Sequence, residues 1–153
     1  EVTCHNLSEL GYSIIGENMK EAKTGSCLCN QVKYEVQGEF ESFYLCHCKF
    51  CQKDTGSSHS ANLFSANSDF RWLAGEDLVS TFKLPSTRHV KSFCSICGSA
   101  LPSIQDNGNL LVIPAGSLDS KFSKMPDAHL FSGSKACWDV NLDKVTAFKT
   151  LPK

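Results

Sequence analysis

Seven of the nine cysteines in this 153-residue chain stand in three short groups whose spacing suits metal binding. Thiolates are favoured ligands of zinc, and two cysteines two or three positions apart can reach one ion. A glycine directly after a C-x-x-C pair also suits the tight backbone turn of a zinc knuckle. The groups are Cys27-x-Cys29, Cys46-x-Cys48-x-x-Cys51 and Cys94-x-x-Cys97-Gly98. The sequence therefore predicts a zinc protein.

Seven ligands divide most simply into four and three. Cys27, Cys29, Cys94 and Cys97 would form a closed structural site that joins the start of the domain to its middle. Cys46, Cys48 and Cys51 would bind a second Zn²⁺ as a tripod and leave a fourth position open. Closed zinc sites are structural, whereas catalytic sites keep an open position. The ligand count predicts that any chemistry occurs at the central group.

Two other interpretations of the cysteines are possible. The central group could be a second structural site, completed by His47, His59, Cys4 or Cys137. The last pair could be a redox dithiol of the thioredoxin kind, but that motif opens a helix. Here Gly98 follows the pair and no helical pattern comes after it, so the redox interpretation is disfavoured.

The segments around these cysteines have the pattern of short strands. In 31–36 the apolar residues Val32, Tyr34 and Val36 alternate with polar ones, which is typical of a half-buried strand. Further strands are expected at 62–64, 69–73, 78–84, 88–93 and 110–113, with turns at 74–77 and 106–109. Many short strands separated by turns predict an all-β sandwich or open barrel.

The remaining elements are predicted from weaker patterns. A short helix is expected at 48–55, another at 120–125, and one or two strands between Trp138 and Phe148. The large aromatic residues are expected in the core; they are Phe64, Trp72, Phe82, Phe93 and Trp138.

Composition narrows the class of protein. The net charge is −1 and no run of Lys or Arg would form a basic face, so nucleic acid is not an expected partner. No stretch approaches the roughly 20 apolar residues of a membrane span. An odd cysteine count without an export signal favours metal ligands over disulfides and a cytoplasmic location. We expect an N-terminal extension at 1–23 and one domain at 24–153.

Ordered motifs along the chain resemble a known family. They begin with Gly25-Ser26-Cys27-Leu28-Cys29 and Cys46-His47-Cys48-Lys49-Phe50-Cys51, and continue with Thr55-Gly56-Ser57 and 70–77. They end with the knuckle at 94–101, Pro114-Ala115-Gly116-Ser117-Leu118-Asp119, His129-Leu130-Phe131 and 134–138. The chain is similar to the glutathione-dependent formaldehyde-activating enzymes, also called the centromere-protein-V-like group.

The resemblance implies an all-β fold of the Mss4-like type, with short twisted antiparallel sheets organised around zinc sites. It also implies the same division of the cysteines into four and three. The implied activity is that of a carbon–sulfur lyase, an S-(hydroxymethyl)glutathione synthase. The implied partners are glutathione and a small aldehyde such as formaldehyde.

In the corresponding mechanism, Cys46, Cys48 and Cys51 carry the catalytic zinc, and a thiol attacks the aldehyde carbon there. His47, His59, Ser57 and His129 are weaker candidates for pocket or acid–base roles, and Cys4 and Cys137 are expected to be free thiols. The alternative function is a non-enzymatic, zinc-stabilised binding module.

Overall fold

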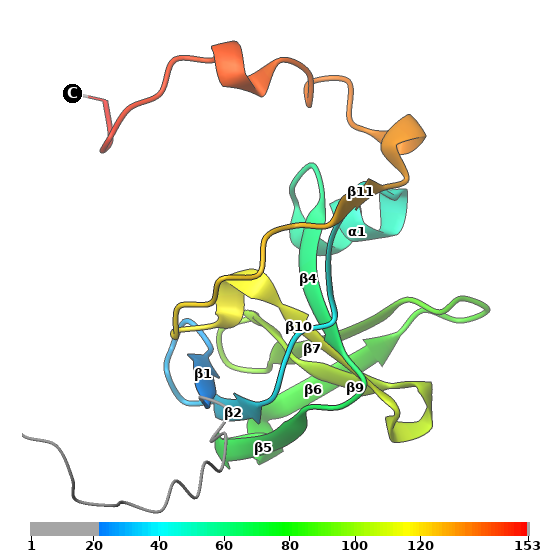
Figure 1. Ribbon diagram of the computed structural model, residues 1–153, viewed down its shortest axis with the longest axis vertical. Coiled ribbons are helices and arrows are strands. Elements are labelled where there is room, and N and C mark those ends of the chain that lie inside the picture. Colours follow the sequence, from blue (N-terminus) through cyan, green and yellow to red (C-terminus); the bar gives the residue numbers. More distant parts are fainter. Residues whose placement is uncertain (1–21, 153) are drawn as a thin grey trace, which may run out of the picture.

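The computed structural model describes residues 22–152, in eleven strands, one α-helix and five single-turn 3₁₀ helices. The extension expected at 1–23, with Cys4, lies outside the described residues except at its last two positions. The described chain is built from three small sheets (Figure 1). The all-β fold class expected from the sequence is confirmed.

The first sheet has the order β1-β2-β5 and is antiparallel throughout. The alternation predicted around Tyr34 is confirmed, because Val32, Tyr34 and Val36 are fully buried while Lys33 and Gln37 face solvent. Tyr34 also donates or accepts a hydrogen bond of 2.6 Å with the Ser117 hydroxyl. The strands are β1 (Lys23–Ser26), β2 (Lys33–Gln37) and β5 (Asp69–Ala74).

The second sheet has the order β11-β3-β4-β10-β9. Its edge strand β11 pairs with β3 in parallel, whereas the other pairs are antiparallel. Helix α1 (Lys49–Thr55) lies between β3 and β4 in the chain and confirms the helix expected at 48–55. The strands are β3 (Ser42–Cys46), β4 (Ser60–Ser65), β9 (Ser103–Gln105), β10 (Leu110–Pro114) and β11 (Ala128–Leu130).

The third sheet is antiparallel, with the order β6-β7-β8. Its strands are β6 (Val79–Lys83), β7 (Val90–Cys94) and β8 (Ala100–Leu101). The 3₁₀ helices are η1 (Glu76–Leu78), η2 (Asp106–Gly108), η3 (Ala115–Ser117), η4 (Ser132–Ser134) and η5 (Leu142–Lys144). The predicted turns at 74–77 and 106–109 coincide with η1 and η2.

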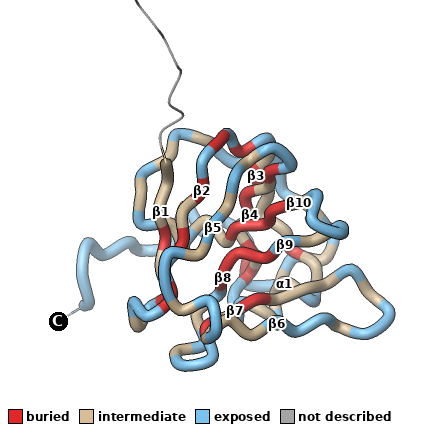
Figure 2. Tube along the Cα trace, turned by 90° about the horizontal axis from the view of Figure 1, so that it is seen from below, coloured by how far each residue is buried: buried red, intermediate tan, exposed pale blue. Residues whose placement is uncertain are grey.

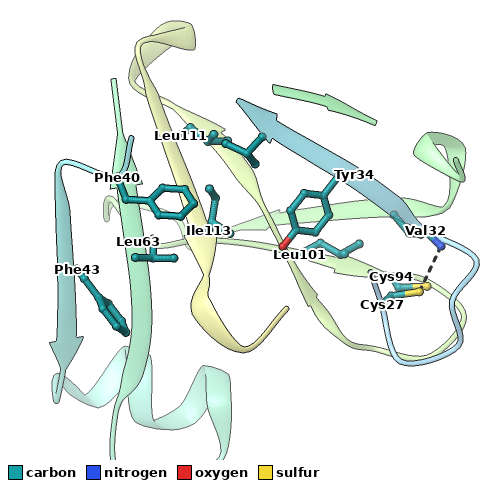
Figure 3. Close-up of a cluster of buried hydrophobic side chains, with 11 residues drawn as sticks. Cys27, Val32, Tyr34, Phe40, Phe43, Leu63, Cys94, Leu101, Leu111 and Ile113 are labelled. Atoms are coloured by element: carbon teal, nitrogen blue, oxygen red, sulfur yellow. Dashed lines mark hydrogen bonds between the residues drawn. The ribbon is translucent and has the colours of Figure 1, made fainter. Parts of the chain in front are cut away.

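Buried residues gather where the strands of the three sheets meet (Figure 2). The cluster extends from Phe40 and Phe43 to Cys27 and Cys94, which close its other end (Figure 3). Burial of a large apolar side chain contributes about 1.5–3 kcal/mol. Cys27 and Cys94 belong to this core, so the cysteine group that the sequence predicts to bind zinc is continuous with the hydrophobic core.

Three expectations about the second half of the chain are wrong. Residues 120–125 form no helix, since Pro126 disfavours a helical conformation in the residue before it, and Phe122 packs against Phe40 and Phe43 from an irregular segment. The segment 138–148 holds η5 and no strand, and it extends away from the sheets (Figure 1). Phe82 and Trp138 are 52% and 58% exposed and so are not core residues.

Within residues 22–152, no helix is long and apolar enough to cross a membrane.

Candidate metal centres

Cys27, Cys29, Cys94 and Cys97 converge from two hairpin turns, and we call them the four-thiol cluster. The first turn joins β1 to β2, and the second joins β7 to β8. Gly98 lies in the left-handed region at φ 73°, with no atom within 4 Å of a Cβ placed there. The backbone conformation therefore explains the glycine after the C-x-x-C pair, as expected for a knuckle.

The distances between the sulfurs suit a tetrahedrally coordinated metal ion. All four Sγ atoms lie within 4.8 Å of one another. Cys27 Sγ is 3.4 Å from Cys29 Sγ, which is 3.9 Å from Cys94 Sγ. Four zinc–sulfur bonds of about 2.3 Å would place the sulfurs about 3.8 Å apart. The donor set thus fits zinc with only small movements.

Backbone and hydroxyl groups surround these sulfurs. The Val32 N–H donates to Cys27 Sγ at 3.3 Å, and Ser99 Oγ lies 3.3 Å from Cys97 Sγ. The Ser99 side chain and then its backbone N–H lower the pKa of Cys97 to about 5. Ser99 Oγ also accepts the Leu28 N–H at 2.9 Å, so it ties one turn to the other. These contacts favour the thiolate form that a metal ion requires.

Cys46, Cys48 and Cys51 form the second group, the three-thiol cluster. Cys46 ends β3, opposite Ser60 of β4 and Leu130 of β11. Cys48 is the N-cap of α1, and its Sγ accepts the Cys51 N–H at 3.4 Å. Helix α1 ends after Thr55 because Gly56 takes the left-handed C-cap conformation at φ 66°. A strand end and a helix start therefore aim three sulfurs at one point.

The three thiols are electrostatically unequal. Burial raises the pKa of Cys51, against a hydrogen bond from the Ser60 side chain that lowers it. For Cys48, burial raises the pKa, but hydrogen bonds from the Cys51 backbone and from neighbouring thiols lower it overall. Three thiolates this close would repel one another, so a cation between them would stabilise the ionised cluster.

No fourth Cys, His, Asp or Glu of residues 22–152 joins the three-thiol cluster. Of the residues that could have completed it, His47 and His59 belong to a separate group. Cys137 is exposed and belongs to no group, and Cys4 lies outside the described residues. The described donors therefore leave room for a fourth ligand.

His47, His59 and Asp139 form a third group, the His–Asp cluster, with one ligand atom from each within 4.8 Å of the others. His47 is 1% exposed, and its Nε2 lies 2.8 Å from Nδ1 of His129. Burial lowers the pKa of His47, although the Asp139 carboxylate acts in the opposite direction. A neutral imidazole in this position can act as a ligand or hydrogen-bond donor.

Gln52 of α1 holds the later chain against this region. Its Nε2 donates to the carbonyl oxygen of His47 and, at 2.8 Å, to that of Ser134. The His47 N–H in turn donates to the Leu130 carbonyl at 2.9 Å. The segment 128–139 is thereby fixed beside the three-thiol cluster.

The sequence identified most of the polar residues that lie near these clusters. His47, His59 and His129 lie together, whereas Ser57 is exposed just beyond the end of α1. Asp139, Ser60 and Ser99 were missed. Asp139 directly follows the 134–138 motif, but no spacing rule connects it with His47, 92 positions earlier in the chain.

Comparison with known proteins gives both a family and a fold. Residues 22–134 match the family described as glutathione-dependent formaldehyde-activating enzyme. A crystal structure of a Rhodobacter sphaeroides protein is similar at 19% identity, with a TM-score of 0.53. The similarity covers 67% of this chain and 97% of that one. No curated protein matches the chain.

Proposed function

Because the chain belongs to the glutathione-dependent formaldehyde-activating enzyme family, we propose that it is a carbon–sulfur lyase that adds a thiol to a small aldehyde. The proposed thiol is glutathione and the proposed aldehyde is formaldehyde. The observation that carries the proposal is the contrast between a group of four convergent thiols and a group of three. Catalytic zinc sites keep a position open, and structural ones do not.

In this proposal the four-thiol cluster holds a structural zinc ion. Cys27 and Cys94 are 3% and 0% exposed, so substrates have little access to their sulfurs. The ion would fix two hairpin turns from distant parts of the chain against the core. Metal sites of this kind contribute directly to folding stability.

The three-thiol cluster would hold the catalytic zinc ion through Cys46, Cys48 and Cys51. Bound zinc would lower the pKa of an incoming thiol and orient a carbonyl group beside it. The chain supplies a preformed tripod, because the Cys51 N–H holds the Cys48 sulfur at the start of α1. The partial burial of all three thiols reduces competition by water at the sulfurs.

The proposed reaction is an addition whose atoms balance between the two substrates. A bond forms between the thiol sulfur and the aldehyde carbon while the carbonyl π bond opens. The thiol proton ends on the new hydroxyl oxygen. In the reverse direction the same bond breaks and releases the aldehyde.

The experiment measures formaldehyde–glutathione exchange by NMR with the zinc-loaded protein. We expect faster exchange with the wild type and the uncatalysed rate with Cys48→Ser, since serine can cap a helix but is a poor zinc ligand. Cys137→Ser is the matched control, because Cys137 is exposed and outside every cluster. An exchange rate unchanged by the wild type would rule out this substrate pair.

A second function, a zinc-stabilised binding module, is favoured by one feature of the surface. The C-terminal segment exposes a series of apolar side chains, namely Trp138, Val140, Leu142, Val145 and Phe148. In this alternative both thiol clusters are structural, and loss of the central zinc unfolds the domain. In the enzyme proposal Cys48→Ser lowers activity but leaves a cooperatively folded protein, which circular dichroism distinguishes.

A further inference from the structure

The His–Asp cluster contains two buried polar atoms that lack a hydrogen bond. His47 Nδ1 lies 3.1 Å from Asp139 Oδ2, yet the two are not aligned for a hydrogen bond. Among residues 22–152 these are the two buried side-chain polar atoms without a partner. An unsatisfied buried polar group costs about 1–3 kcal/mol, so two such atoms side by side require a reason.

The hydrogen bond at the other ring nitrogen of His47 bears on whether Nδ1 carries a proton or a lone pair. His47 Nε2 lies 2.8 Å from His129 Nδ1. If Nε2 donates this bond, Nδ1 presents a lone pair toward a carboxylate that also presents lone pairs. Two acceptors at 3.1 Å repel unless a metal ion or a proton lies between them. Metal-bound histidines usually donate their second ring N–H to a neighbouring acceptor, which is the role His129 would have.

The distances and the donor types suit a metal ion. Bonds of about 2.0–2.1 Å in a tetrahedron place nitrogen and oxygen ligands about 3.3 Å apart. The third donor, His59, offers a ring nitrogen within 4.8 Å of both other ligand atoms. Its ring lies 5.0 Å from that of His47. Two imidazoles and one carboxylate suit a divalent first-row transition metal.

The neighbouring ammonium group of Lys135 does not form a hydrogen bond with the Asp139 carboxylate. Lys135 Nζ lies 3.9 Å from Asp139 Oδ2, beyond hydrogen-bond distance, and its side chain is 37% exposed. A partly solvated ammonium group at that distance contributes little. The carboxylate oxygen that faces His47 thus remains available as a ligand.

We propose that His47, His59 and Asp139 form a third metal site, which binds a divalent transition-metal ion with nitrogen and oxygen ligands. The site adjoins the three-thiol cluster along the chain, because His47 stands between Cys46 and Cys48 but its side chain belongs to the other group. An ion there joins the strand end that carries the thiols to the segment 128–139. Its function is to fix that strand end.

The probe for this site is Co²⁺. It is added to full-length protein from which mild chelation has removed all metal except two zinc ions per chain. Cobalt in the third site gives ligand-field bands without the intense thiolate-to-cobalt charge transfer that a cysteine site gives. We expect one further saturable Co²⁺ ion per chain with this spectrum. We also expect Co²⁺ to raise the melting temperature of the two-zinc protein, since it binds the folded state.

Two ligand variants and two comparison variants make the test specific. Asp139→Asn keeps the size of the side chain, and His59→Gln changes a half-buried residue, so at least one should fold. We expect each to weaken Co²⁺ binding by 10-fold or more, and His129→Gln by about 10- to 100-fold as an outer partner. His89→Gln, which changes a histidine paired with Asp54 elsewhere, should leave binding unchanged.

Absence of a saturable third ion in the wild type would overturn the proposal. So would equal Co²⁺ affinity in the wild type, Asp139→Asn and His59→Gln. Zinc content and formaldehyde–glutathione exchange are measured on the same samples. A chain that retains two zinc ions and exchange activity but binds no Co²⁺ would refute the third site alone.

Discussion

Cys48 Sγ accepts the backbone N–H of Cys51 at 3.4 Å, so one sulfur both caps helix α1 and belongs to the three-thiol cluster. The N-cap position leaves the cysteine in an extended conformation, with φ −65° and ψ 157°. Helix formation and the arrangement of the cluster therefore depend on the same side chain.

Two substitutions at Cys48 separate these roles. Cys48→Ser retains a capping oxygen, whereas Cys48→Ala removes the cap and should lower the free energy of unfolding by a further 1 kcal/mol or so. Both variants should bind one zinc ion fewer than the wild type. Thermal unfolding with the central site empty, together with metal analysis, measures the difference. Equal stability of the two variants would show that the cap has no energetic role.

Chelation should remove the two proposed zinc ions in a fixed order. The central ion would have three protein ligands, and the other would have four, two of which lie in the core. A chelator titration should release one equivalent with the fold intact and the second only with unfolding. Circular dichroism monitors the fold, and a colorimetric zinc indicator monitors the released zinc. Simultaneous release of both ions would contradict this order.

Gly25→Ala should destabilise the protein through a steric clash. A Cβ at Gly25 would overlap the Tyr34 ring and the Ser117 carbonyl, and Tyr34 is fully buried. Overpacking of this kind costs about 1–3 kcal/mol. Denaturant unfolding measures the loss. Gly116→Ala is the matched control, because a Cβ there meets no atom within 4 Å.

The pH dependence of stability should include a contribution from Asp127, which joins β11 to β3. The Lys124 ammonium group and then the Phe43 N–H, both at 2.7 Å from the carboxylate, lower the pKa of Asp127. A carboxyl whose pKa is lower when folded stabilises the protein above its unfolded pKa of about 3.9, and this contribution disappears as pH falls through the folded pKa.

Asp127→Asn should therefore be less stable than the wild type near neutral pH. The difference should shrink as the pH falls from about 4 through the lowered pKa of the folded protein, where the native carboxylate takes up a proton. Urea unfolding of both proteins at matched pH values tests this. A stability difference that stays constant down to the lowest pH would mean that the ionised form of Asp127 has no special role.

Local patterns in the sequence were sufficient for six of the eleven strands, for the turns and for the grouping of the thiols, whereas β1, β3, β8, β9 and β11 were not predicted. Alternation identified β2, and the position of Gly98 indicated the left-handed turn at the second knuckle. Each of these features depends on residues close together in the chain. The same holds for α1, which begins and ends within the central motif.

Features that depend on distant contacts could not be predicted. Asp139 approaches His47 only because Gln52 and β11 hold the later chain beside β3. Trp138 and Val145 have apolar character that suggested strands, but within residues 22–152 no strand pairs with that segment. Hydrophobicity alone does not distinguish a buried strand from an exposed apolar segment.

The central claim is that the three-thiol cluster holds an ion with one position open to a thiol. The most direct test places Co²⁺ in that cluster, with zinc in the four-thiol cluster, and adds glutathione. We predict that glutathione increases the thiolate-to-cobalt charge-transfer absorption, and that Cys48→Ser, which cannot assemble the site, shows no such increase. A wild-type spectrum unchanged by glutathione, in a protein that still accelerates the exchange, would contradict the account.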